Sequence, residues 1–121
     1  MKTKALFTTV LAALALVCFA AIAELSGKWI GSLTIPDGTF DVNYNFKAEG
    51  NKLTGTVQAA GPELAIDSGK INGNDFSFQV TDPEGVHYLL KGKYYPAGDT
   101  CGADITFNNM TVHSTLKRQG K

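Results

Sequence analysis

Apolar and polar residues alternate along most of the chain after residue 38. The clearest run is residues 39–47, in which every even position is apolar or aromatic and every odd position is polar or charged. Similar runs occupy residues 52–59, 76–81, 86–94 and 101–107. This alternation is typical of antiparallel strands that bury one face and expose the other. The pattern predicts an all-β domain, and no helix of two turns is expected after residue 23.

Turn-forming residues separate these runs at fairly regular intervals. Clusters of Gly, Asn, Asp and Pro lie at residues 36–38, 49–51, 60–62, 72–74, 82–85, 96–99 and 108–109. Short strands between such turns indicate a sandwich or a barrel. We predict a small antiparallel up-and-down β-barrel of about eight or nine strands, because closure removes the exposed strand edges that promote aggregation.

The first 23 residues have the pattern of an export signal. Lys2 and Lys4 precede an apolar run that ends in the small-x-small sequence Ala21-Ile22-Ala23. This combination is typical of a cleavable signal peptide, whereas a membrane span needs roughly 20 apolar residues. We therefore expect a signal peptide at residues 1–23, one barrel domain at residues 24–121, and a periplasmic or extracellular location without a transmembrane segment after cleavage.

Cys18 leaves a second possibility open, since a lipoprotein signal also ends at a cysteine. In that case the protein is lipid-anchored through Cys18. The residue before it is Val17, however, where a small residue is expected in a lipoprotein signal.

Composition excludes some classes of partner. Without Lys2 and Lys4 the 11 basic residues fall to 9 against 11 acidic ones, a formal net charge of −2. No basic patch with interleaved aromatic residues is present, so nucleic acid is not an expected partner. Cys101 is the single cysteine after residue 23, which rules out an internal disulfide within 24–121. It alternates with other apolar residues, and we expect its thiol to be buried and inert.

A short motif opens the domain. Gly27-Lys28-Trp29 resembles the G-x-W signature of lipocalin-like (calycin) barrels. The resemblance implies that Trp29 closes the base of the barrel and that a basic residue on the last strand packs across its ring. Arg118 is expected to be that residue, because it shares the inward parity of Leu116. The chain departs from typical lipocalins in being much shorter and in lacking their C-terminal helix and cysteine pair.

The chain also resembles small exported bacterial domains that are found beside secreted glycoside hydrolases. This second resemblance implies association with an enzyme and not catalysis by this chain. An accessory or protein-interaction domain of a secreted, possibly glycan-active enzyme is therefore one open interpretation. Three apolar residues fall on outward faces: Ile30, Leu89 and Tyr95. They either form a patch for such a partner or are scattered surface residues, and we favour scatter.

Our leading hypothesis is a non-catalytic binding module for a small apolar or sugar-like ligand. An eight-stranded barrel is just wide enough to be filled by side chains or to hold one small ligand. The number of inward aromatic residues favours filling, but both outcomes stay open. Five inward residues are the candidate ligand-binding residues if a cavity exists: Tyr44, Phe46, Phe78, Tyr88 and Tyr94.

No motif for catalysis, metal binding or a cofactor is apparent, and we expect none of the three. His87 and His113 fall on outward faces and lack other ligands at metal spacing. The serine-hydrolase motif G-x-S-x-G does not occur. A glycosidase needs two carboxylates that flank one sugar bond, and the outward acids Asp41 and Asp104 are the residues to test for it.

Overall fold

The protein is described from a computed structural model that covers residues 25–119. The predicted signal peptide at residues 1–23 and the alternative lipidation site Cys18 lie outside the described residues. Among the described residues, no helix is long and apolar enough to cross a membrane. The strands are β1 (Gly27–Ile35), β2 (Gly38–Glu49), β3 (Lys52–Gln58), β4 (Leu64–Ala65), β5 (Asp67–Asn72), β6 (Asp75–Thr81), β7 (His87–Tyr95), β8 (Thr100–Phe107) and β9 (Met110–Arg118).

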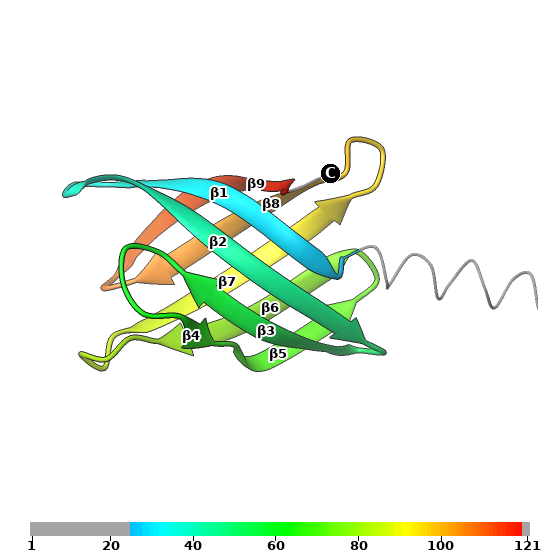
Figure 1. Cartoon of the computed structure of the whole chain (residues 1–121), viewed down its shortest axis with the longest axis horizontal. Coiled ribbons are helices and arrows are strands. Elements are labelled where there is room, and N and C mark those ends of the chain that lie inside the picture. The colour runs from blue at the N-terminus through cyan, green and yellow to red at the C-terminus, as the bar shows by residue number, and fades with distance from the viewer. Residues whose placement is uncertain (1–24, 120–121) are drawn as a thin grey trace, which may run out of the picture.

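The strands form one antiparallel sheet that closes on itself (Figure 1). Their order is β2-β1-β9-β8-β7-β6-β5-β3-β4, and β2 also pairs with β3. Eight strands therefore make a closed up-and-down barrel, and the two-residue β4 is an addition on the edge of β3. The all-β fold class and the predicted number of strands are confirmed.

The barrel has two chemically different ends, which we name by their loops. The mouth carries the loops at residues 36–37, 59–63, 82–86 and 108–109, on the left in Figure 1. The base carries the turns at residues 50–51, 73–74 and 96–99, together with residues 25–26, on the right. Consecutive strands run in opposite directions between these two ends. We call the position of an inward side chain along the barrel axis, from base to mouth, its level.

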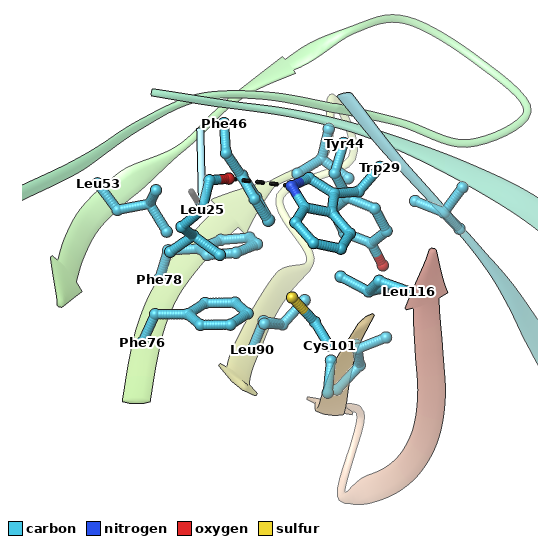
Figure 2. Close-up of a cluster of buried hydrophobic side chains, with 14 of the residues drawn as sticks. Leu25, Trp29, Tyr44, Phe46, Leu53, Phe76, Phe78, Leu90, Cys101 and Leu116 are labelled. Carbon is cyan, nitrogen blue, oxygen red and sulfur yellow. Dashed lines mark hydrogen bonds between the residues drawn. The ribbon is translucent and has the colours of Figure 1, made fainter. Parts of the chain in front are cut away.

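The base half of the barrel is filled by side chains (Figure 2). Phe46 lies at the centre of this packing, with its ring centroid 5.7 Å from those of both Phe76 and Phe78 in edge-on geometry. Trp29 is fully buried, and its indole N–H donates to the Leu25 carbonyl oxygen at 2.9 Å. The free thiol of Cys101 lies in the same core and is fully buried, as its alternation predicted.

Two parts of the barrel wall are irregular. Strand β5 contains a bulge between Asp67 and Lys70, where Ser68 adopts a φ of 56°. On the other side, β1 and β9 pair only from Trp29–Arg118 to Gly31–Leu116 and then diverge toward the mouth. In Figure 1 the β1–β2 and β8–β9 hairpins separate at that end. The wall therefore opens gradually from the closed base to the mouth.

Candidate functional site

A cavity of about 420 Å³ occupies the mouth half of the barrel. This volume falls within the range of small-molecule sites in proteins, roughly 300–1,000 Å³. The wall is largely apolar and combines aliphatic side chains with aromatic rings. Its aromatic residues are Phe40, Tyr44, Phe78, Tyr88 and Phe107, and its larger aliphatic residues are Leu33, Ile35, Val42, Val57, Leu64, Val80, Leu90 and Ile105.

Tyr44 places a buried, unpartnered hydroxyl in this apolar wall. The residue lines the cavity and is only 2% exposed. No hydrogen bond to its hydroxyl is found among residues 25–119. Every completely sealed side-chain polar atom of these residues has a partner, so the Tyr44 hydroxyl is not completely sealed. The cavity is the open space that Tyr44 lines.

Burial raises the pKa of Tyr44 well above its ordinary value. The hydroxyl is therefore neutral at physiological pH and can both donate and accept a hydrogen bond. An unpartnered polar group in an apolar site costs free energy until a bound molecule satisfies it. Tyr44 thus supplies a buried polar group of the cavity that is available to a ligand.

Tyr88 lines the cavity nearer the mouth, and its hydroxyl is already engaged. It donates to Asp82 Oδ2 at 3.1 Å, while its ring packs on Phe107 with a centroid distance of 5.0 Å. Asp82 Oδ1 accepts from the backbone N–H groups of Glu84 and Val86, both at 2.9 Å. The carboxylate therefore ties the 82–86 loop to the cavity wall.

These hydrogen bonds also set the protonation states at the rim. The backbone N–H of Val86, followed by the Tyr88 hydroxyl and the N–H of Glu84, holds the pKa of Asp82 below its usual value against the effect of burial. Burial and the bond to Asp82 raise the pKa of Tyr88. The pair is accordingly a carboxylate and a neutral phenol at neutral pH. Sequence alternation identified Tyr88 and gave no signal for Asp82, which lies in a loop.

The five candidate ligand-binding residues divide between the two halves of the barrel. Tyr44, Phe78 and Tyr88 line the cavity. Phe46 and Tyr94 do not line it and instead pack in the base, Phe46 against Phe76 and Tyr94 against Trp29 with a centroid distance of 6.0 Å. All five point inward, as expected, but parity alone could not distinguish the two levels.

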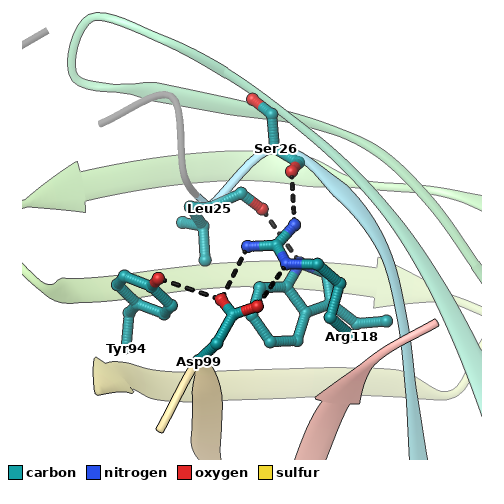
Figure 3. Close-up of polar contacts among 6 residues, drawn as sticks. Leu25, Ser26, Tyr94, Asp99 and Arg118 are labelled. Atoms are coloured by element: carbon teal, nitrogen blue, oxygen red, sulfur yellow. Dashed lines mark hydrogen bonds and ion pairs between the residues drawn. The ribbon is translucent and has the colours of Figure 1, made fainter. Parts of the chain in front are cut away.

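The base is closed by the two ends of the domain. The Arg118 guanidinium carbon lies 4.3 Å from the centroid of the Trp29 ring, and its Nη1 donates to the Ser26 carbonyl oxygen at 2.8 Å (Figure 3). Gly27 adopts a φ of +130°, and a Cβ at this position would lie 2.8 Å from Arg118 Nη1. The positive φ and the close approach of Arg118 both favour glycine at position 27, two residues before Trp29. This gives the G-x-W motif a physical reason in this chain.

Asp99 is a third member of this contact that the sequence did not reveal. Its carboxylate accepts from Arg118 Nε at 2.8 Å and from Nη2 at 3.0 Å, and the Tyr94 hydroxyl donates to the same carboxylate at 3.0 Å. Asp99 lies in the β7–β8 turn with a φ of 51°. We call Trp29, Arg118, Asp99 and Tyr94 the base clasp.

Comparisons of the chain with protein-family models, with curated proteins and with solved structures find no match. The fold itself, a closed antiparallel eight-stranded barrel, is compatible with a lipocalin-like barrel. Function must therefore be argued from the cavity and from the outer surface.

The outer face brings no two candidate catalytic acids together. Asp41 accepts from Ser32 Oγ at 3.2 Å, and Asp104 contacts His113 Nδ1 at 2.9 Å. Their strands, β2 and β8, are separated by β1 and β9, so roughly 14 Å of sheet lies between them at a strand spacing near 4.8 Å. This exceeds the 5–9.5 Å or so that the carboxylates of a glycosidase require.

The outward apolar residues are also dispersed. Leu89 is 42% exposed and Tyr95 is 50% exposed, and they lie six positions apart on β7. Six residues of strand span about 20 Å. Ile30 is half-buried on β1, with β9 and β8 between it and β7. These three residues therefore do not form one continuous patch.

Proposed function

We propose that this protein is an exported, non-catalytic binding module that holds one small, largely apolar molecule in the mouth of its barrel. The observation that carries the proposal is the cavity of about 420 Å³, with its largely apolar wall and the unpartnered hydroxyl of Tyr44. Burying the apolar body of a ligand there gains about 25 cal/mol per Å² removed from water. A hydrogen bond to Tyr44 orients the molecule.

An apolar ligand fits this wall better than a sugar does. A sugar brings several hydroxyl groups, and each one buried without a partner costs about 1–3 kcal/mol. Of the two tyrosine hydroxyls in the wall, only that of Tyr44 is unoccupied, because Tyr88 already donates to Asp82. The class we propose is therefore a molecule with an apolar body and one or two polar groups.

The relationship to lipocalin-like barrels is part of the proposal. It is supported by the stacking of Arg118 on Trp29 and by the antiparallel pairing of the first and last strands. The alternative of an accessory domain for a secreted enzyme finds no comparable support, because the outward apolar residues Ile30, Leu89 and Tyr95 are dispersed. Export rests on the sequence pattern of residues 1–23.

Displacement of a fluorescent probe tests the proposal. N-phenyl-1-naphthylamine is neutral and brightens in apolar surroundings, so the domain should increase its emission, and decan-1-ol should reverse the increase. Val80→Phe places extra volume in the cavity and should abolish both effects. Leu89→Phe, on the exposed outward face of β7, is the matched control and should retain both effects.

Tyr44→Phe supplies the second arm. It removes one hydroxyl and leaves the ring, so decan-1-ol should bind about fivefold more weakly, the equivalent of one net hydrogen bond. Decane should be unaffected, since it has no group to pair with Tyr44. Probe binding that survives Val80→Phe and is lost in Leu89→Phe would place the site elsewhere and refute the proposal.

A further inference from the structure

The basic residues of the barrel are concentrated toward its base, which also holds the acidic residues Glu49, Asp75 and Asp99. Within residues 25–119, the four mouth loops contain four acidic residues and no lysine or arginine. The base and the strand ends next to it hold most of the basic residues of the same region: Lys28, Lys47, Lys52, Lys93, Lys117 and Arg118. The mouth is thus an acidic rim around an apolar cavity, although the chain as a whole is nearly neutral.

The acids of the rim are Asp37, Glu63, Asp82 and Glu84. Asp82 and Glu84 line the cavity itself, and Glu63 lies between the lining residues Pro62 and Leu64. None of the four forms an ion pair with a lysine or arginine among the described residues. Their negative potential is therefore uncompensated where a ligand must enter.

A cavity mouth of one charge sign concentrates ligands of the opposite sign and repels those of the same sign. An apolar chain inside the cavity places its polar end either at Tyr44, deep in the wall, or at the rim. At the rim, an anionic group meets only carboxylates, whereas a cationic group meets two that line the entrance. The charge of the rim therefore discriminates among ligands that the apolar wall accepts equally.

We infer that the ligand is a cationic amphiphile, with an apolar body in the cavity and an amine or quaternary ammonium group at the rim beside Asp82 and Glu84. This inference rests on the proposed function, because it specifies the ligand of the same cavity. Fatty acids and other anionic amphiphiles are disfavoured by the same electrostatics at low ionic strength. The unpartnered Tyr44 hydroxyl, buried and lining the cavity, accommodates a second polar group within the apolar body.

Three probes of equal chain length separate this inference from the proposed function. Decan-1-amine is a cation at pH 7, decan-1-ol is neutral and decanoate is an anion, and each is used to displace N-phenyl-1-naphthylamine below its aggregation concentration. At low ionic strength the amine should bind about tenfold more tightly than decanoate, with the alcohol between them. In about 0.5 M salt the three affinities should converge, because screening weakens interactions with exposed charges.

Two double variants test whether the charges of the mouth cause the preference for decan-1-amine over decanoate. Glu63→Gln/Glu84→Gln removes two rim charges that make no side-chain hydrogen bond among the described residues and should reduce the amine-to-decanoate ratio about threefold or more. Glu49→Gln/Asp75→Asn makes the same change in net charge at the base, on exposed residues, and should leave the ratio unchanged.

The outcomes are distinguishable. If the alcohol binds and the amine shows no advantage over decanoate, the cationic inference is wrong and the apolar binding function stands. If both double variants reduce the ratio equally, net charge and not the rim sets the preference, which also overturns the inference. If none of the three probes displaces the dye, the proposed function fails together with the inference.

Discussion

The base clasp gives the sharpest quantitative prediction for the fold. Arg118 has a side chain only 16% exposed, and it stacks on Trp29 while forming two hydrogen bonds with Asp99. We consider Arg118→Met, which keeps the length and apolar stem of the side chain and removes its charge and donors. Lys117→Met, on the neighbouring exposed residue, is the matched control.

The expected magnitude follows from the contacts. A cation over an indole contributes about 0.5–2 kcal/mol depending on desolvation. Truncating a charge-assisted hydrogen bond costs about 1.5–3 kcal/mol, and the bidentate pair with Asp99 is partly exposed, which lowers its value. We therefore expect Arg118→Met to reduce the free energy of unfolding by about 3 kcal/mol, and Lys117→Met to change it by less than about 0.5 kcal/mol.

Double-mutant cycles separate the two contacts of Arg118. The cycle of Arg118→Met with Asp99→Asn should give a coupling energy of about 2 kcal/mol. The cycle with Trp29→Leu should give about 1 kcal/mol, because the loss of the Trp29 hydrogen bond to Leu25 occurs in both arms and cancels. Trp29→Leu is preferred to Trp29→Ala, which leaves a larger cavity.

Urea unfolding monitored by far-ultraviolet circular dichroism supplies the free energies. A marginally stable domain tolerates these substitutions singly, so the double variants should be measured in a stabilising salt such as sulfate. Coupling energies below about 0.3 kcal/mol in both cycles would mean independent sites and would refute the clasp as an energetic unit.

Three further changes test other parts of the account. Gly92→Ala adds a methyl group where the Phe76 ring covers Gly92, so it should destabilise the fold by about 1–3 kcal/mol, and Phe76→Leu in the same chain should restore part of the loss in urea unfolding. Burial raises the pKa of the Cys101 thiol from 9.0 to about 12, so its contribution to stability is present below pH 9 and is lost between about 9 and 12, and Cys101→Ala should remove that part of the alkaline slope. The pKa of Asp82 is lowered, so its contribution is present above the ordinary value near 3.8 and is lost as pH falls through the lower folded value; Asp82→Asn should flatten the acid limb of the urea midpoint, and an unchanged limb would contradict the loop interpretation.

Sequence alternation predicted the barrel because each long strand has one solvent-exposed face and one buried face. In β2, the even positions Val42, Tyr44 and Phe46 are buried, and the odd positions between them are exposed. The pattern fails at β4 and β5, where two residues are too few to alternate and the bulge after Asp67 interrupts the period. Those strands had to be inferred from the turns around them.

The odd or even position of a residue in its strand predicts whether its side chain points inward. It does not predict whether that side chain lies near the base or near the mouth. Tyr88 and Tyr94 lie on the same face of the same strand, yet Tyr88 lines the cavity and Tyr94 packs on Trp29 in the base. Their levels depend on the register of β7 with its neighbours, which the structure supplies. Loop residues are harder still, since neither Asp82 nor Asp99 belongs to an alternating run.

The cavity could not be deduced from the number of inward aromatic residues. Such residues occur at both ends, with Trp29, Phe46, Phe76 and Tyr94 in the base and Phe40, Tyr44, Phe78, Tyr88 and Phe107 around the cavity. Their count therefore does not tell how completely the barrel is filled. The sequence indicated a barrel and favoured a filled one, whereas the structure has a cavity of about 420 Å³ in the mouth half.

Methyl-selective NMR of the domain titrated with decan-1-ol tests the central claim most directly, because leucine and valine methyl groups occur in both halves of the barrel. Binding in the mouth should shift the methyl signals of Leu33, Val80 and Leu90, which line the cavity. The signals of Leu53 and Leu116, which lie in the filled base, should stay in place. Shifts confined to the base or to exposed methyl groups, or no saturable shifts at all, would contradict a ligand site in this barrel.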